Sequence, residues 1–214
     1  MDFQSISNTI RVKCAVIGDS MVGKSSLLSQ LTSDGKSFPK NYLMTQGADM
    51  THKSVNIPDT NDVVELYLLD SSGKEMYSSI LSEIWKSEDI ALVIVVYDVT
   101  NEESFRRVSW WVNRLHKSSS SEEDDKEEKD QEDLNFEERK SSFPGVLIGN
   151  KIDMKERRVI SPKLGSELAS KLSLVYFETS SKDYQGCEEP FYYLANEWYK
   201  LYNEKCERIV NNGV

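Results

Sequence analysis

The sequence predicts a three-layer α/β fold in which a six-stranded, mostly parallel sheet is flanked by five helices. Runs rich in β-branched residues alternate along the chain with segments of helical periodicity, which is typical of βαβ units. Two of these runs, residues 90–97 (IALVIVVY) and 146–149 (VLIG), are continuously apolar. Central strands have that composition because helices cover both of their faces. The chain is therefore expected to bury a parallel sheet between two layers of helices.

One pair of strands is expected to be antiparallel. The run at 51–57 alternates between polar and apolar residues, and the turn-forming residues 58–62 (PDTND) connect it to the next run. A hairpin of this kind is expected at an edge of the sheet. The six expected strands are residues 11–17, 51–57, 63–69, 90–97, 146–149 and 174–177.

Helices are expected between and after these strands. Asn101 and Ser161 are typical N-cap residues, and Pro162 suits the first position of a helix. The last helix carries an apolar stripe at three- and four-residue spacing, which normally covers a sheet. The stripe consists of Phe191, Leu194, Trp198, Leu201 and Tyr202. The five expected helices are residues 24–31, 75–86, 102–117, 162–172 and 188–210.

The negative charge is concentrated in one segment. The protein has 214 residues and a formal net charge of −10, and residues 118–142 alone hold eleven acidic and four basic residues. We expect a disordered insertion there, because so little apolar surface does not offset the loss of chain entropy. Both a tolerated surface loop and a phosphorylatable acidic patch fit this composition. The domain then covers 9–208 around the insertion, with tails at 1–8 and 209–214.

Several classes of protein are disfavoured by composition. The chain has no face dense in Lys and Arg, which nucleic-acid binding requires. The apolar run at 90–97 is far short of the ~20 residues that span a bilayer. Residues 1–13 lack the features of a secretory signal. The three cysteines, Cys14, Cys187 and Cys206, have no ligand-like spacing and indicate reduced thiols. A cytoplasmic location is expected.

Residues 18–25 (GDSMVGKS) fit the pattern G-x-x-x-x-G-K-[ST] between an expected strand and an expected helix. That context is the one a phosphate-binding loop requires, although a plain strand-to-helix turn is the alternative. Backbone N–H groups would cradle the phosphates, Lys24 would reach the outer ones, and the Ser25 hydroxyl would bind Mg²⁺. The candidate nucleotide-binding residues here are Asp19, Ser20, Met21, Val22, Gly23, Lys24, Ser25 and Ser26.

A second motif, D-x-x-G, runs from Asp70 to Gly73 at the end of the third expected strand. The Asp70 carboxylate would hold Mg²⁺ through water, and the Gly73 N–H would meet the terminal phosphate. This motif is weak alone, because turn residues after a strand commonly have this composition. Its position after the strand makes it useful.

Two further motifs follow the fifth and sixth strands, at the carboxyl edge where α/β sheets bind ligands. In residues 150–153 (NKID), Asp153 can accept hydrogen bonds from the N1–H and the 2-amino group of guanine. Adenine offers no such pair of donors. In residues 178–182 (ETSSK), Ser181 would present its N–H to the base O6 and Lys182 would flank the ring.

In this order, each after its own strand, the motifs resemble those of the Ras/Rab-like small GTPases over residues 9–208, the insertion excepted. The resemblance implies a P-loop NTPase G domain that binds GTP or GDP with Mg²⁺. It also implies that Phe38 packs on the guanine edge and that Thr45 joins the Mg²⁺ shell when the γ-phosphate is present. The nucleotide-binding set then includes Phe38, Thr45, Gly73, Asn150, Lys151, Asp153, Ser180, Ser181 and Lys182, and the metal set is Ser25, Thr45 and, through water, Asp70.

A closer similarity points to one branch, the Rab-like GTPase of intraflagellar transport complex B. The resemblance implies a heterodimer with a small β-sandwich subunit through helix 188–210, and contacts with other subunits of the transport complex. It also implies a location at the cilium or flagellum and its basal body. The segments that carry it are residues 33–35 (SDG), 58–60 (PDT), 64–66 (VEL), 70–75 (DSSGKE), 97–105 (YDVTNEESF), 144–151 (PGVLIGNK) and 177–180 (FETS).

Two departures from the family pattern affect the expected activity. Lys74 stands where most small GTPases have the glutamine that orients the attacking water, and an ammonium donates but cannot accept hydrogen bonds. We expect slow intrinsic hydrolysis, unless Lys74 is only a solvated loop residue and another group places the water. The last residues, CERIVNNGV, have no cysteine at a prenylation position, so no direct lipid anchor is expected. The candidate catalytic residues are Lys24, Thr45, Gly73 and the degenerate position Lys74.

The sequence is compatible with two functions. The first is a regulatory subunit of the transport complex, in which GTP or GDP sets the order of the loops around Thr45 and Gly73 during ciliary cargo transport. The second is a structural pseudo-GTPase subunit that holds nucleotide without cycling. An ATP-dependent phosphotransferase is disfavoured because residues 150–153 select guanine.

Overall fold

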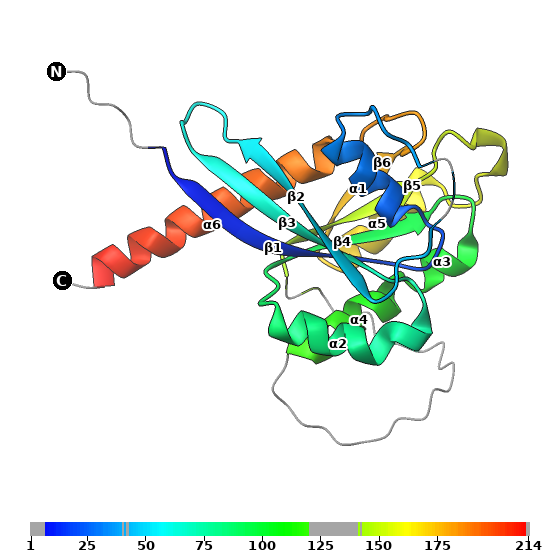
Figure 1. Cartoon of the computed structure of the whole chain (residues 1–214), viewed down its shortest axis with the longest axis horizontal. Helices are drawn as coiled ribbons and strands as arrows, with labels where there is room; N and C mark the ends of the chain where they lie inside the picture. Colours follow the sequence, from blue (N-terminus) through cyan, green and yellow to red (C-terminus); the bar gives the residue numbers. More distant parts are fainter. Residues whose placement is uncertain (1–6, 40, 42, 120–140, 142, 213–214) are drawn as a thin grey trace.

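Figure 1 shows the computed structural model of the chain, which describes residues 7–39, 41, 43–119, 141 and 143–212. Six strands form one sheet in the order β2-β3-β1-β4-β5-β6. The strands are β1 Thr9–Ile17, β2 Ala48–Asn56, β3 Val63–Ser71, β4 Leu92–Asp98, β5 Gly145–Asn150 and β6 Val175–Thr179. The prediction of a six-stranded sheet is confirmed.

The sheet is parallel except at one edge. β2 and β3 pair antiparallel from Ala48 opposite Ser71 to Asn56 opposite Val63, and all other neighbours are parallel. In the turn between them, the Ile57 N–H donates to the Asp62 carbonyl oxygen at 3.0 Å. The predicted edge hairpin is therefore confirmed. Its long strands carry the chain from the loop around Thr45 to the D-x-x-G motif.

Helices cover both faces of the sheet. The α-helices are α1 Lys24–Thr32, α2 Ser78–Ser87, α3 Glu102–Arg106, α4 Val108–Ser119, α5 Pro162–Lys171 and α6 Glu189–Asn212, with 3₁₀ turns η1 Glu75–Tyr77 and η2 Lys155–Arg157. One core cluster joins the sheet to α1 and α6, and the other joins it to α2, α4 and α5. Figure 1 shows α2 and α4 on the side opposite to α6. The predicted three-layer architecture is confirmed.

The helix boundaries follow the expected caps. Asn101 Oδ1 accepts hydrogen bonds from the N–H groups of Glu103 and Ser104, and α3 begins there. Ser161 Oγ accepts from the Leu164 N–H, with Pro162 at the start of α5. The helix predicted at 102–117 is divided at Arg107 into α3 and α4. The segment predicted at 75–86 opens as the tighter turn η1, so the chain after Gly73 is not regular α-helix at its start.

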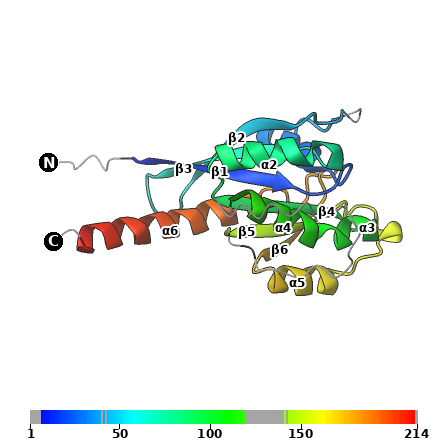
Figure 2. The ribbon, with the colours of Figure 1, turned by 90° about the horizontal axis from the view of Figure 1, so that it is seen from below.

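The last helix extends beyond the sheet. Phe191 and Leu194 are buried in the core, as the apolar stripe predicts. Farther along, Leu201 is 40% and Tyr202 42% exposed. Figures 1 and 2 show that the C-terminal half of α6 projects past the sheet, at the end of the molecule where the N-terminus lies. The stripe therefore covers the sheet only in its first half, because the sheet ends before the helix does.

Two other expectations concern the insertion and membrane-spanning segments. The predicted insertion at 118–142 lies mostly outside the described residues. Of its margins, Ser118 belongs to α4, and the Ser141 N–H donates to the Leu172 carbonyl at 2.7 Å. In the described part of the chain, no helix is long and apolar enough to cross a membrane.

Candidate functional site

The loop between β1 and α1 approaches its neighbours so closely that two positions require glycine. Gly18 has φ 138°, and a side-chain carbon added there would lie 2.1 Å from the Val96 carbonyl oxygen. Gly23 has φ 101°, and an added carbon would lie 2.3 Å from Asn150 Nδ2. α1 begins at the next residue, Lys24, so the unbonded N–H groups of its first turn lie at the end of this loop. The local structure is that of an anion-binding loop.

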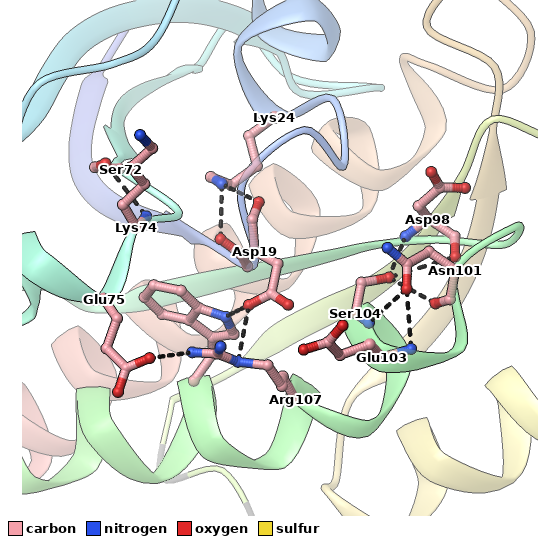
Figure 3. A network of polar contacts seen from close by, with 12 residues as sticks. Asp19, Lys24, Ser72, Lys74, Glu75, Asp98, Asn101, Glu103, Ser104 and Arg107 are labelled. Atoms are coloured by element: carbon pink, nitrogen blue, oxygen red, sulfur yellow. Dashed lines mark hydrogen bonds and ion pairs between the residues drawn. The ribbon is translucent and has the colours of Figure 1, made fainter. Parts of the chain in front are cut away.

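Lys24 is a buried ammonium within the loop. Its Nζ donates to the carbonyl oxygens of Gly18 at 2.7 Å and of Asp19 at 2.8 Å (Figure 3). Burial lowers the pKa of Lys24 to about 8, while the charges of Asp70 and Asp19 act in the opposite direction. An anion beside Lys24 would stabilise its charged form. The loop therefore provides both the N–H donors and the cation that a phosphate group needs.

Three oxygen-bearing side chains meet beside the first turn of α1. Ser25 Oγ lies 3.1 Å from Thr45 Oγ1, and Thr45 Oγ1 donates to Asp70 Oδ2 at 3.5 Å. Asp70 is buried, and its Oδ1 has no hydrogen-bond partner among the described residues. Burial raises the pKa of this carboxyl, against the effect of hydrogen bonds from Ser25 and Thr45 and of the Lys24 charge.

This oxygen cluster fits a magnesium ion. Mg²⁺ is a hard cation that takes hydroxyl, carboxylate and water oxygens and keeps several of its waters. The unpaired Oδ1 of Asp70 would gain a partner from a metal-bound water, and the metal charge would stabilise the carboxylate against its burial. The residues that the sequence predicts for the metal, Ser25, Thr45 and Asp70, are thus brought together by three separate elements.

The chain after β3 lies directly on the phosphate loop. The Ser20 N–H donates to the Gly73 carbonyl oxygen at 3.0 Å. A side-chain carbon added at Gly73 would lie 2.2 Å from backbone atoms of Asp19 and Ser20. In this structure the carbonyl of Gly73, and not its N–H, is bonded to the loop. Lys74 is exposed, and its N–H donates to Ser72 Oγ at 3.4 Å (Figure 3).

A network of polar contacts joins the phosphate loop to α4 and to η1 (Figure 3). The Asp19 carboxylate accepts from Trp111 Nε1 at 2.7 Å and pairs with Arg107 at 3.2 Å. Arg107 also reaches Glu75 at 3.4 Å, and its guanidinium lies 4.8 Å above the Trp110 ring. Burial raises the pKa of Asp19, and the contacts with Trp111 and Arg107 oppose that change. No sequence motif indicated these partners of the loop.

At the other end of the site, Asn150 joins three segments. Its Nδ2 donates to the Val22 carbonyl oxygen in the phosphate loop at 2.9 Å. Its Oδ1 accepts from Thr179 Oγ1 at 3.0 Å, and from Ser181 Oγ at 3.1 Å and N at 3.2 Å. All four hydrogen bonds are buried. Asn150 therefore fixes the ends of β5 and β6 to the phosphate loop.

The residues around Asn150 lie at the end of the site where the sequence predicts a guanine base, here called the base end of the site. Asp153 Oδ1 accepts a hydrogen bond from Ser180 Oγ at 2.8 Å, which orients this carboxylate. Lys151 is paired with Asp98 at 2.6 Å, between the ends of β5 and β4. The Ser181 N–H, predicted to face a base oxygen, is directed to Asn150. Phe38 is 44% exposed, with no ring contact to the site among the described residues.

The sequence profile of the Ras family matches residues 13–200, which is most of the chain. The chain belongs to the Ras family. Among relatives of this small GTPase, the intraflagellar transport protein 27 homolog of Bos taurus is 40% identical over 198 residues, 92% of this chain and 95% of the relative. The Homo sapiens homolog is 38% identical, again over 92% of this chain and 95% of the relative. Intraflagellar transport protein 27 of Chlamydomonas reinhardtii is 31% identical over 94% of this chain and 90% of the relative. The resemblance to the Rab-like GTPase of intraflagellar transport is thereby confirmed.

The structure of this small GTPase brings most predicted site residues together. The phosphate loop, Thr45, Asp70 and Gly73 form one group, and Asn150, Asp153 and the loop after β6 form the other. Met21, Phe38, Lys74 and Lys182 are exposed, and their roles stay predictions. The sequence motifs include neither of two residues that contact the site: Arg107, which pairs with Asp19, and Gln30, whose Nε2 donates to the Ser181 carbonyl oxygen at 2.8 Å. Gln30 gave one signal, a polar residue among the buried leucines of α1, whereas Arg107 gave none.

Proposed function

We propose that this chain is a regulatory small GTPase that binds GTP or GDP with Mg²⁺ and acts as a subunit of the intraflagellar transport B complex. The observation that carries the proposal is the convergence of the two groups of site residues at one edge of the sheet, joined by the Asn150 to Val22 hydrogen bond. An elongated ligand with phosphates at one end and a base at the other matches that layout. Asp153, oriented by Ser180, supports guanine as the base.

In this proposal, the residues of the phosphate loop and those of the oxygen cluster have separate roles. The N–H groups of the loop and of the first turn of α1 would bind phosphate oxygens, and Lys24 would move its donors from the Gly18 and Asp19 carbonyls to the outer phosphates. Ser25, Thr45 and, through water, Asp70 would hold the metal. When bound, Mg²⁺ neutralises phosphate charge and orients the phosphates. Thr45 Oγ1 already lies 3.1 Å from Ser25 Oγ, so the two hydroxyls are close enough to bind one ion.

Hydrolysis is proposed to be slow without an activating partner. The residue after Gly73 is Lys74, which is exposed and whose ammonium cannot accept a hydrogen bond from water. Groups that position water or stabilise transition-state charge typically govern ~10³–10⁵ of the rate in GTPases. Lys24 and the Gly73 N–H remain as the groups that would bind the reacting phosphate, and Thr45 remains as a ligand that would hold the metal. The chain would therefore stay loaded with GTP for long periods.

The names of the relatives supply the cellular setting of the proposal. Homologues from animals, an alga and a trypanosome are named intraflagellar transport protein 27, so we place this chain in ciliary or flagellar transport, in the cytoplasm and at the basal body. A small β-sandwich subunit is proposed as its heterodimer partner, bound through helix 188–210. The projecting half of α6, with Ile209 and Val210 exposed, supports a role for this helix in contacts with another chain.

A binding comparison tests the regulatory role. The purified chain would be loaded with GDP or with a non-hydrolysable GTP analogue and mixed with the transport complex lacking this subunit. We expect the two nucleotide states to differ at least tenfold in affinity, because nucleotide state changes the loops around Thr45 and Gly73. Equal affinity in the two states would favour the alternative, a structural pseudo-GTPase that holds nucleotide without cycling.

A further inference from the structure

Gln30 connects α1 to the loop after β6 by a buried hydrogen bond. Its Nε2 donates to the Ser181 carbonyl oxygen at 2.8 Å, across 151 positions of sequence. The side chain is only 2% exposed, and it lies among the buried leucines Leu27, Leu28 and Leu31 of the same helix. Gln30 belongs to none of the motifs described above, and it does not line the phosphate loop.

The bond fixes the plane of one peptide at the base end of the site. The described part of the chain has no cis peptide bond, so the Ser181 carbonyl and the Lys182 N–H of the shared peptide point in opposite directions. With the carbonyl held against α1, the Lys182 N–H is turned away from α1. The preceding N–H, that of Ser181, is already bonded to Asn150. Gln30 thus determines where the next backbone donor of this loop points.

Other contacts hold the loop after β6 against α1. Gln30 therefore affects the orientation of the Ser181–Lys182 peptide and not the position of the whole loop. Gly35, just after α1, packs so closely on Tyr184 that an added side-chain carbon would lie 2.6 Å from the ring. Ser180 and Gln185 exchange two backbone hydrogen bonds, which close the loop at its base. Between these anchors, the Ser181 carbonyl has Gln30 as its buried donor.

The polar side chain carries a cost that an apolar residue would avoid. Gln30 Oε1 is buried and has no hydrogen-bond partner among the described residues. Such an unpaired buried acceptor destabilises a fold, whereas an apolar side chain of the same shape would pack among the leucines without that penalty. The benefit of glutamine at this position is therefore the single bond to Ser181, at the site of base recognition.

We propose that Gln30 is a positioning residue for nucleotide recognition, which orients the Ser181–Lys182 peptide so that its N–H donates to the O6 oxygen of a guanine base. The proposal rests on the guanine-nucleotide function proposed above and adds a residue to it. Gln30 does not touch the base itself. It acts through the peptide that does, and it sets how long a nucleotide whose base carries O6 stays bound.

The test compares the rate of nucleotide dissociation from the wild-type chain with that from Gln30→Met. This variant keeps the shape of the side chain but removes the hydrogen-bond donor. Rates would be measured by stopped flow with ribose-labelled GDP, with IDP, which keeps O6, and with 2-aminopurine riboside diphosphate, which lacks it. We expect release of GDP and IDP to become about ten- to a hundredfold faster, and release of the 2-aminopurine nucleotide to change less than about threefold. Thr32→Val is the matched control, because it removes a side-chain bond to the Leu28 carbonyl within α1.

The outcomes separate the proposal from its alternatives. Equal acceleration for all three nucleotides would overturn it, because Gln30 would then only support the fold; unchanged rates would overturn it as well. If Gln30→Met does not fold, Gln30→Leu, which also removes the donor and leaves no buried polar atom at this position, replaces it, and the same selective acceleration is expected. If the wild-type chain binds none of the three, the guanine-nucleotide function itself fails, which the wild-type measurement alone reveals.

Discussion

Replacement of Asn150 by alanine tests whether the two ends of the site are joined as described. Asn150 is 1% exposed and makes four buried hydrogen bonds, to Val22, Thr179 and twice to Ser181. Each such bond contributes about 0.5–1.5 kcal/mol to stability, and the partners left behind are buried and unpaired. We therefore expect Asn150→Ala to lower the free energy of unfolding by roughly 2–6 kcal/mol.

Urea denaturation of the nucleotide-free protein measures this effect without a contribution from ligand binding. The matched control is Asn113→Ala on α4, because Asn113 is also buried but its Oδ1 has no partner among the described residues. That variant should cost less than about 1 kcal/mol. Similar losses in the two variants would refute the reasoning, because burial of an amide and not the bridging bonds would then set the stability.

Three further predictions concern the phosphate end of the site. Lysine titrates near pH ~10.4 in an unfolded chain, and burial lowers the pKa of Lys24 to about 8 in the folded state. The unfolded chain thus binds more protons between these values, so the free energy of unfolding of the nucleotide-free protein should rise with pH across that window; Lys24→Met should abolish the rise in urea titrations at several pH values. Arg107→Ala removes the ion pairs of Arg107 with Asp19 and Glu75 and one of the two guanidinium groups over the Trp110 ring, since Arg114 also lies 5.3 Å from that ring. This variant should change stability by less than about 1 kcal/mol but increase acrylamide quenching of tryptophan fluorescence. Arg106→Ala is the control, because Arg106 pairs with Glu102 on its own helix, and it should not increase the quenching. Equal quenching in the two variants would contradict the network around Arg107. Lys74→Gln should speed single-turnover GTP hydrolysis at least tenfold, whereas Lys86→Gln on α2 should leave it unchanged; an unaltered rate in Lys74→Gln would show that another group places the water.

Much of the fold could be predicted from the sequence because the strongest patterns come from burial. The apolar runs that became β4 and β5 have no polar side to expose, and the alternation in β2 marks an edge strand. The turn at 58–62 fixed the hairpin. The end of α6 was less predictable, because its apolar stripe continues past the point where the sheet stops.

The site was predictable where a motif is local. The phosphate loop lies within eight consecutive residues, and its glycines are required by close approach. The contacts of Asp19 with Trp111 and of Gln30 with Ser181 span 92 and 151 positions, and they depend on how helices dock on the sheet. No short pattern encodes such pairs. Residues that position a site from a distance are therefore found only in the folded chain.

The most direct test of the central claim is nucleotide selectivity measured by titration calorimetry in the presence of Mg²⁺. Two hydrogen bonds to the Asp153 carboxylate, at about 1.5–3 kcal/mol each, predict that the wild-type chain binds GDP at least a hundredfold more tightly than ADP. Asp153→Asn should prefer xanthosine diphosphate (XDP), because an amide can donate to the xanthine O2. The control Asp183→Asn should keep the preference for GDP. Equal affinity of the wild-type chain for GDP and ADP, or an Asp153→Asn variant that still prefers GDP, would contradict the account.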